Sequence, residues 1–191
     1  MAATGAPALT RREFIGFGAT AAAGMALSGC ATNPVSGRSQ LMLMSETQEI
    51  AQDRAASPHM FSADYGAVQD AGLNAYVSEI GGQLAAHSHR PGMPYSFRVL
   101  NSPVIDAYTF PAGSVGVSRA LILGMESESE LAAVLGHEIG HVCARHAAQR
   151  YTQGMVTTLI AAGVSAYVQR EHEKYAELAA GLGSVGAGAL Q

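Results

Sequence analysis

Two histidines and a glutamate form the group in this chain best suited to metal chemistry. His137 and His141 are four residues apart, so on a helix they lie one turn apart on the same face. This spacing lets two imidazoles bind one zinc ion, and Glu138 stands beside them to accept a proton from an attacking water. The alternative is a buried helix whose histidines are satisfied by hydrogen bonds. We predict that His137 and His141 bind Zn²⁺ and that Glu138 is a general base.

The sequence around these residues predicts the helix that positions them. Ser127 and Glu130 have the spacing of a capping box at a helix start. Apolar residues then recur at helical spacing, at Leu131, Val134, Leu135, Ile139 and Val142. No proline occurs between Ser127 and Tyr151, so we expect helix across this run. Cys143 lies on the same helix but points away from the histidine face, which favours a small buried side chain over a zinc ligand.

Bulk composition indicates one globular domain preceded by a leader. Hydrophobic residues make up 48% of the chain, which is enough to build a core. The formal net charge is -4, and acidic and basic residues are interspersed along the sequence. Because there is no basic stripe with interleaved aromatic residues, the composition argues against nucleic acid as a partner.

Residues 1–30 have the parts of an export signal. Paired arginines with a phenylalanine two places on, within residues 11–14, resemble a twin-arginine signal. The weakly apolar run at 14–29 is short for a membrane span. Leu27-Ser28-Gly29-Cys30 resembles a bacterial lipobox, in which the cysteine is lipidated; the alternative is an ordinary cleaved signal with a coincidental cysteine. We expect a lipid anchor at Cys30 on the periplasmic side of an envelope membrane, and Ala31 favours the outer membrane.

Residues 31–45 are predicted to form a linker with a turn at 34–38 and a short apolar strand at 41–44. Ser45 and Gln48 have capping-box spacing and predict a helix from Glu46 to about Ala56, followed by a loop at 58–66. A second helix is predicted from Asp70 to Ala86. His87 and His89 follow it, and histidines there more often end a helix than bind a metal.

A small sheet is predicted directly before the histidine helix. Residues 95–100 alternate in hydrophobicity, and 105–110 and 114–117 are two further strands around a Pro-Ala-Gly turn. An exposed edge strand in this position could pair with an extended peptide and place its scissile bond over the metal. Residues 152–168 predict an apolar helix packed in the core behind the histidine helix, rather than a membrane span. The fold class is therefore α+β, mainly helical, with a small sheet preceding the zinc helix.

Three segments resemble a known family: Asn-Pro-Val-Ser-Gly-Arg at 33–38, residues 95–117, and His-Glu-Ile-Gly-His-Val-Cys-Ala-Arg-His at 137–146. Together they resemble the HtpX-like and CAAX-prenyl-endopeptidase-like zinc metalloproteases, peptidase family M48, and within it the periplasmic lipoproteins. The resemblance implies a gluzincin-type domain over residues 46–191, a Zn²⁺ cofactor, and misfolded or misassembled envelope proteins as polypeptide substrates. Four residues in and after the sheet depart from the expected types: Asp106, Ala112, Gly116 and Ala120.

A catalytic zinc takes three protein ligands and a water. The resemblance implies a third ligand from a Glu-x-x-Ala-Asp pattern on a later helix. Glu173 is the candidate here, although Glu177 stands in place of the aspartate. The alternative, which the Ala/Gly-rich run at 179–190 favours, is a glutamate beyond Gln191 and a domain that is C-terminally incomplete. The function expected is zinc metalloendopeptidase; the alternative is a catalytically incomplete chaperone-like or assembly factor that keeps the fold.

Overall fold

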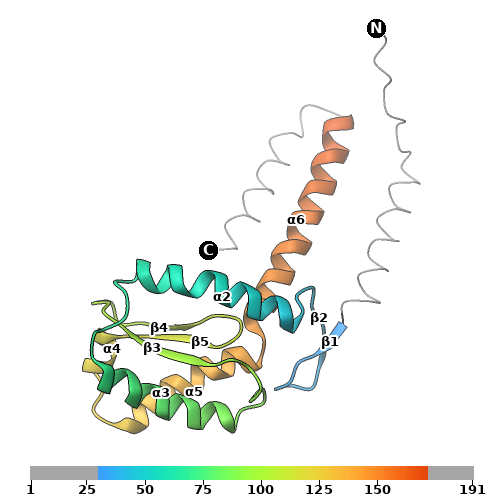
Figure 1. The fold of residues 1–191 in the computed structure, drawn as a ribbon. Coiled ribbons are helices and arrows are strands. Elements are labelled where there is room, and N and C mark those ends of the chain that lie inside the picture. Colours follow the sequence, from blue (N-terminus) through green and yellow to red (C-terminus); the bar gives the residue numbers. More distant parts are fainter. Residues whose placement is uncertain (1–29, 172–191) are drawn as a thin grey trace.

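The computed structural model describes residues 30–171, with side chains as far as residue 165. A body of helices and a small sheet contains the predicted site, and α6 (His146–Glu171) extends away from that body (Figure 1). The predicted α+β class is confirmed. Glu173 and the predicted leader up to residue 29 lie outside the described residues. Among the described residues, no helix is both long enough and apolar enough to cross a membrane.

A three-stranded sheet forms the centre of the body. Its order is β3 (Ser96–Leu100), β5 (Ser114–Ser118) and β4 (Ala107–Thr109), close to the predicted strands. The central strand β5 runs parallel to β3 and antiparallel to β4, which leaves β4 at one edge. A short helix, α4 (Arg119–Leu123), follows β5.

The apolar core lies between this sheet and two helices, α3 (Ala71–Ala86) and α5 (Glu128–Cys143), on one of its faces (Figure 1). The predicted second helix is confirmed, with Asp70 as its N-cap. The core is built from buried side chains of both layers: Val77, Phe97, Val99, Val115, Val117, Leu131, Leu135 and Ile139. Because Leu131, Leu135 and Ile139 face the sheet, they fix the rotation of α5 about its axis.

Helix α2 (Glu46–Ala63) covers the other face of the sheet (Figure 1). The predicted capping box is confirmed: the Gln48 N–H donates to Ser45 Oγ, and the Ser45 N–H donates to Gln48 Oε1. The predicted end near residue 56 and the loop at 58–66 are wrong, because the helix continues through Pro58. Phe61 beyond that proline stacks edge-on against Phe110 at a centroid distance of 5.6 Å, and such aromatic packing offsets the hydrogen bond lost at a proline.

Residues 30–44, most of them in the predicted linker, form a hairpin that packs against the start of α6. Strands β1 (Cys30–Thr32) and β2 (Ser39–Leu41) pair antiparallel, so the second strand begins earlier than the predicted 41–44. Gly37 takes a φ of +67° in the turn, a conformation open to glycine. Met42 and Met44 are buried against Ala148 of α6.

The helix carrying the histidines is shorter than expected. The expectation of helix across 127–151 is wrong at one place, since α5 ends at Cys143 and α6 begins at His146. Arg145 between them takes a φ of +58°, which non-glycine residues rarely adopt. The expectation that residues 152–168 form a core helix is also wrong for the described side chains. Several large ones on α6 are exposed: Tyr151, Met155, Leu159 and Ile160.

Candidate metal centre

Helix α5 brings the three predicted site residues together. Ser127 is its N-cap, with Oγ accepting the Glu130 N–H at 3.3 Å. The Glu130 carboxylate accepts the Glu126 N–H instead of completing a capping box. With the apolar side of α5 turned to the core, His137 is exposed, His141 is half-buried and Glu138 is only 7% exposed.

The geometry of the three side chains fits a zinc ion. His137 Nε2 and His141 Nε2 lie 3.0 Å apart, and the potential ligand atoms of His137, Glu138 and His141 all lie within 4.8 Å of one another. Two nitrogens on a tetrahedral zinc are separated by about 3.3 Å, given Zn–N bonds of about 2.0–2.1 Å. The donor types and the convergence of the two Nε2 atoms therefore match what zinc requires of two histidine ligands.

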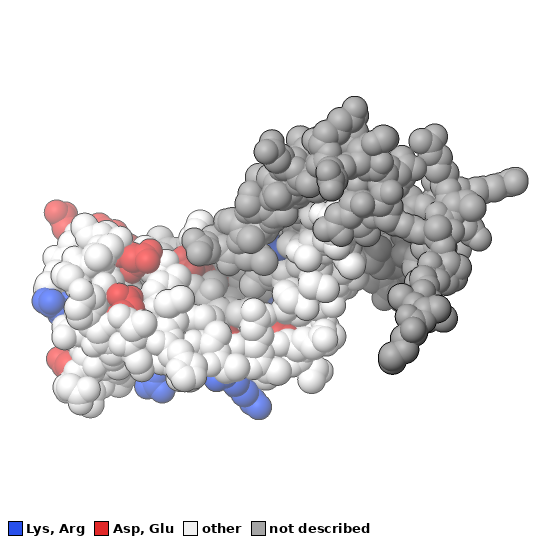
Figure 2. All heavy atoms as spheres, turned by 90° about the horizontal axis from the view of Figure 1, so that it is seen from above, with Lys and Arg blue, Asp and Glu red and all other residues white. Residues whose placement is uncertain are grey.

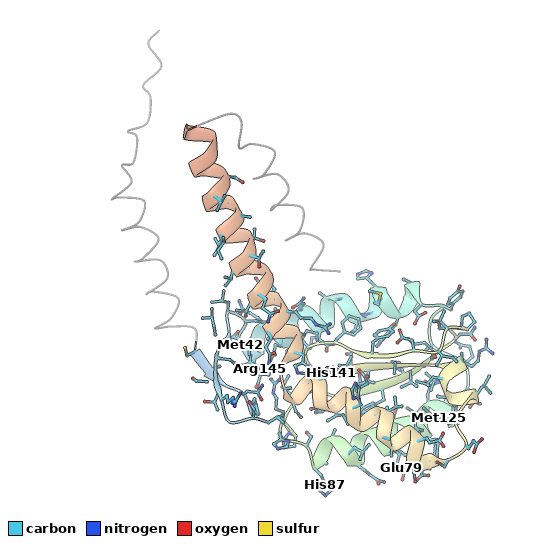
Figure 3. The ribbon with its side chains drawn as sticks, turned by 180° about the vertical axis from the view of Figure 1, so that it is seen from behind. Met42, Glu79, His87, Met125, His141 and Arg145 are labelled. Atoms are coloured by element: carbon cyan, nitrogen blue, oxygen red, sulfur yellow. The ribbon has the colours of Figure 1, made fainter. Side chains whose placement is uncertain are left out.

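The other histidine and cysteine candidates lie elsewhere. His87 is at the end of α3, far from His141 (Figure 3), and its Nδ1 contacts the Gln83 carbonyl at 2.9 Å. His89 is exposed in the loop that follows. Cys143 is 2% exposed, as predicted for a buried side chain, and its Sγ lies 3.8 Å from Tyr95 Oη.

Burial shifts the pKa values of two residues of the site. It raises the pKa of the Glu138 carboxyl; nearby His137 opposes this shift and the Asp106 carboxylate adds to it. Burial also lowers the pKa of His141, and the adjacent His146, His137 and Arg150 lower it further. The second shift favours the neutral imidazole, the form in which histidine binds metals.

A cleft of about 300 Å³ opens in front of these residues. One wall is the edge strand β4 and the turn after it, Ala107 to Pro111, and the floor is α5. The opposite wall comes from the start of α6 and the break before it: Arg145, His146, Ala147 and Arg150. The cleft thus joins an open strand edge to the histidine pair.

His146 is a site residue to which sequence reasoning gave no role. Its Nδ1 lies 2.6 Å from Nδ1 of His141, on the side of that ring away from His137. On an unbroken helix, a residue five places after His141 would point about 140° away from it. Only the break at Arg145 brings His146 back to the site, and no residue type in the sequence indicates that break.

On the face seen in Figure 2, the Arg, Asp and Glu residues of the described part are scattered among uncharged ones. This distribution resembles the interspersed charges of the sequence.

Comparison with known proteins places this geometry in a family. The family model described as "Peptidase family M48" matches residues 71–190. The chain is 35% identical over 100 residues to the beta-barrel assembly-enhancing protease of Yersinia pestis, covering 52% of this chain and 19% of that protein. It is 39% identical over 71 residues to the mitochondrial metalloendopeptidase OMA1 of Arabidopsis thaliana, covering 37% and 15%.

These matches span less than a fifth of either relative's length. The family match, in contrast, runs from the start of α3 through the sheet, the His137–His141 helix and the whole of α6. It therefore includes every residue of the site described above. The chain belongs to peptidase family M48, whose members are zinc metallopeptidases.

Proposed function

We propose that this protein is a zinc metalloendopeptidase in which His137 and His141 bind the metal and Glu138 is the general base. The observation that carries the proposal is the pair of Nε2 atoms 3.0 Å apart at the cleft, beside a buried carboxylate. Imidazole pairs at this spacing suit zinc, and a carboxylate beside them suits proton transfer.

The chain's own residues account for the proton transfer. When bound, zinc polarises the scissile carbonyl and lowers the pKa of water. The Glu138 carboxylate accepts a proton from the attacking water and returns it to the leaving amine. The pKa of Glu138 is raised above that of an ordinary glutamate, toward neutral pH. A general base is most effective when its pKa lies near the working pH.

The edge strand β4 offers a binding mode for polypeptides. Its hydrogen bonds to β5 come from even-numbered positions: the Ser118 N–H donates to the Asp106 carbonyl, and the Phe110 N–H donates to the Ser114 carbonyl. By the alternation of an antiparallel pair, the main-chain groups of Ala107 and Thr109 point toward the open edge. An extended peptide pairing there would cross the cleft above His137 and His141.

A catalytic zinc needs one more protein ligand. We propose a carboxylate for this position, and Glu173 is the candidate in the printed sequence. Glu173→Ala should lose zinc during dialysis that the wild-type chain survives, while Glu177→Ala should keep it. Zinc retained in Glu173→Ala would assign the third ligand to another residue.

The proposed setting is the bacterial envelope, with the protein lipid-anchored at Cys30 on the periplasmic side and misfolded or misassembled envelope proteins as substrates. Support comes from the lipobox-like residues 27–30 and from relatives named beta-barrel assembly-enhancing protease. Cys30→Ala should move the protein from the membrane fraction to the soluble fraction. A variant that still sediments with membranes would refute the anchor.

The decisive test of the activity is Glu138→Gln in the full chain. Cleavage of a fluorescently labelled unfolded polypeptide should fall by about 10²–10⁴-fold, the usual contribution of a general base. Bound zinc after dialysis should match that of the wild type, because the two histidines remain. Glu79→Gln, an exposed glutamate on α3, is the matched control and should cleave normally. Equal turnover in both variants would refute the role of Glu138, and a wild type without retained zinc would favour the catalytically incomplete alternative.

A further inference from the structure

We propose that His146 is a positioning residue that holds the His141 ring in the orientation and tautomer needed for metal binding. The inference rests on the proposed zinc site. The His141 ring lies between two other imidazoles, with Nε2 at 3.0 Å from His137 Nε2 and Nδ1 at 2.6 Å from His146 Nδ1. The two contacts use different ring nitrogens of His141. One nitrogen can therefore bind the metal while the other forms a hydrogen bond.

The tautomer follows from the role of Nε2. A neutral imidazole that offers the Nε2 lone pair to a metal carries its proton on Nδ1. The Nδ1–H of His141 then donates to the Nδ1 lone pair of His146, which must carry its own proton on Nε2. A metal-binding histidine usually donates its second N–H to a carboxylate, a carbonyl or a water, and this partner fixes the ring. Here an imidazole serves as that acceptor.

Specific contacts hold the break before α6, and this break determines where His146 lies. The break before α6 depends on Arg145, whose Nε donates to Glu49 Oε1 at 3.1 Å and whose Nη2 donates to the Met44 carbonyl at 2.8 Å. The Ala144 carbonyl accepts hydrogen bonds from Gln149 Nε2 at 2.7 Å and from Asn33 Nδ2 at 3.2 Å. Figure 3 shows Arg145 at this joint, and Arg145 and His141 line the same cleft. These hydrogen bonds stabilise the break, and the break places His146 beside His141.

The test compares two kinds of substitution in the full chain. In His146→Asn the amide oxygen stands near the position of Nδ1 and can accept the hydrogen bond, whereas His146→Leu and His146→Phe have no acceptor. Zinc affinity is measured by competition with a chromophoric chelator, and thermal unfolding of the metal-free protein is measured in parallel. His59→Leu, at an exposed position on α2, is the matched control.

Loss of the acceptor should weaken zinc binding about 10–100-fold, the usual effect of removing such a partner. His146→Asn should stay within a few-fold of the wild type, and the metal-free proteins should unfold at similar temperatures. Two acceptor-free variants are included so that a folding defect in one leaves the other to decide. Wild-type affinity in an acceptor-free variant, or equal loss in His146→Asn, would overturn the inference and leave the proposed function standing. A wild type that binds zinc no better than His137→Leu would overturn both.

Discussion

Replacing Glu49 tests how the joint between α5 and α6 is held. The side chain is fully buried, and its Oε2 accepts from Arg90 Nη2 at 2.8 Å while Oε1 accepts from Arg145 Nε at 3.1 Å. The Arg90 side chain is 6% exposed and that of Arg145 is 12% exposed. One carboxylate thus neutralises two nearly buried cations and joins α2 to the break before α6.

The expected cost follows from these contacts. Glu49→Ala removes the carboxylate that pairs with Arg145 and leaves Arg90 with only the exposed Glu46 as an anionic partner. Breaking a buried ion pair costs about 3–5 kcal/mol. Each arginine keeps another acceptor, the Val142 carbonyl for Arg90 and the Met44 carbonyl for Arg145. These remaining bonds place the expected loss near the lower limit, about 3 kcal/mol in the free energy of unfolding. For a domain of this size, this loss corresponds to a fall in Tm of about 6–12 °C.

Glu46 provides a matched control on the same arginine. It pairs with Arg90 Nη2 at 3.0 Å, but its side chain is 63% exposed, so Glu46→Ala should cost under about 1 kcal/mol. Urea unfolding followed by far-ultraviolet circular dichroism measures both variants in the full chain. A loss of stability in Glu49→Ala no larger than that in Glu46→Ala would refute the reasoning. Burial would then add nothing to the strength of the ion pairs that Glu49 makes.

Two further predictions concern packing and pH. Gly81→Ala should destabilise the protein by about 1–3 kcal/mol, because a Cβ there would lie 2.6 Å from the Phe97 ring. A Cβ at Gly82 on the same helix would meet open space, so Gly82→Ala should stabilise the protein by up to about 1 kcal/mol. Equal changes in the free energy of unfolding for the two variants, measured by urea unfolding, would contradict this account. Burial raises the pKa of Tyr95 to about 12, above the usual tyrosine value of about 10. The stability that the protonated Tyr95 side chain contributes is therefore complete below about pH 10 and declines as the pH rises toward 12. Tyr95→Phe should show a smaller decline over that interval in urea unfolding, and parallel curves would exclude Tyr95 as the cause.

The sequence predicted those features that depend on local residue patterns. The cap at Ser45, the cap at Ser127 and the strand near residues 96–100 each follow from neighbouring residues, and each is present in the structure. The placement of His137, Glu138 and His141 on one helix also needs only helical spacing. Local chemistry therefore suffices for the centre of the site.

The features that were missed depend on contacts between residues distant in the sequence. Helix α2 continues past Pro58 because Phe61 packs against the sheet residue Tyr108 and against Phe110 just after β4. Gly116 departs from the expected residue type for a similar reason: a Cβ there would meet Leu100 at 2.8 Å and Phe61 at 3.0 Å. No pattern within a short window contains either partner, so neither feature could be predicted from spacing alone.

The joint between α5 and α6 brings the turn at residues 33–38 into contact with the end of the histidine helix. Asn33 Oδ1 accepts the N–H groups of Val35 and Ser36, which closes the turn, and its Nδ2 donates to the Ala144 carbonyl. That carbonyl belongs to the C-cap of α5, one residue before Arg145 with its positive φ. A helix end of this kind needs partners for its last carbonyls, and the side chain of Asn33 supplies one from 111 residues away. The Asn33 turn therefore supports the position of His146, although it lies outside the cleft.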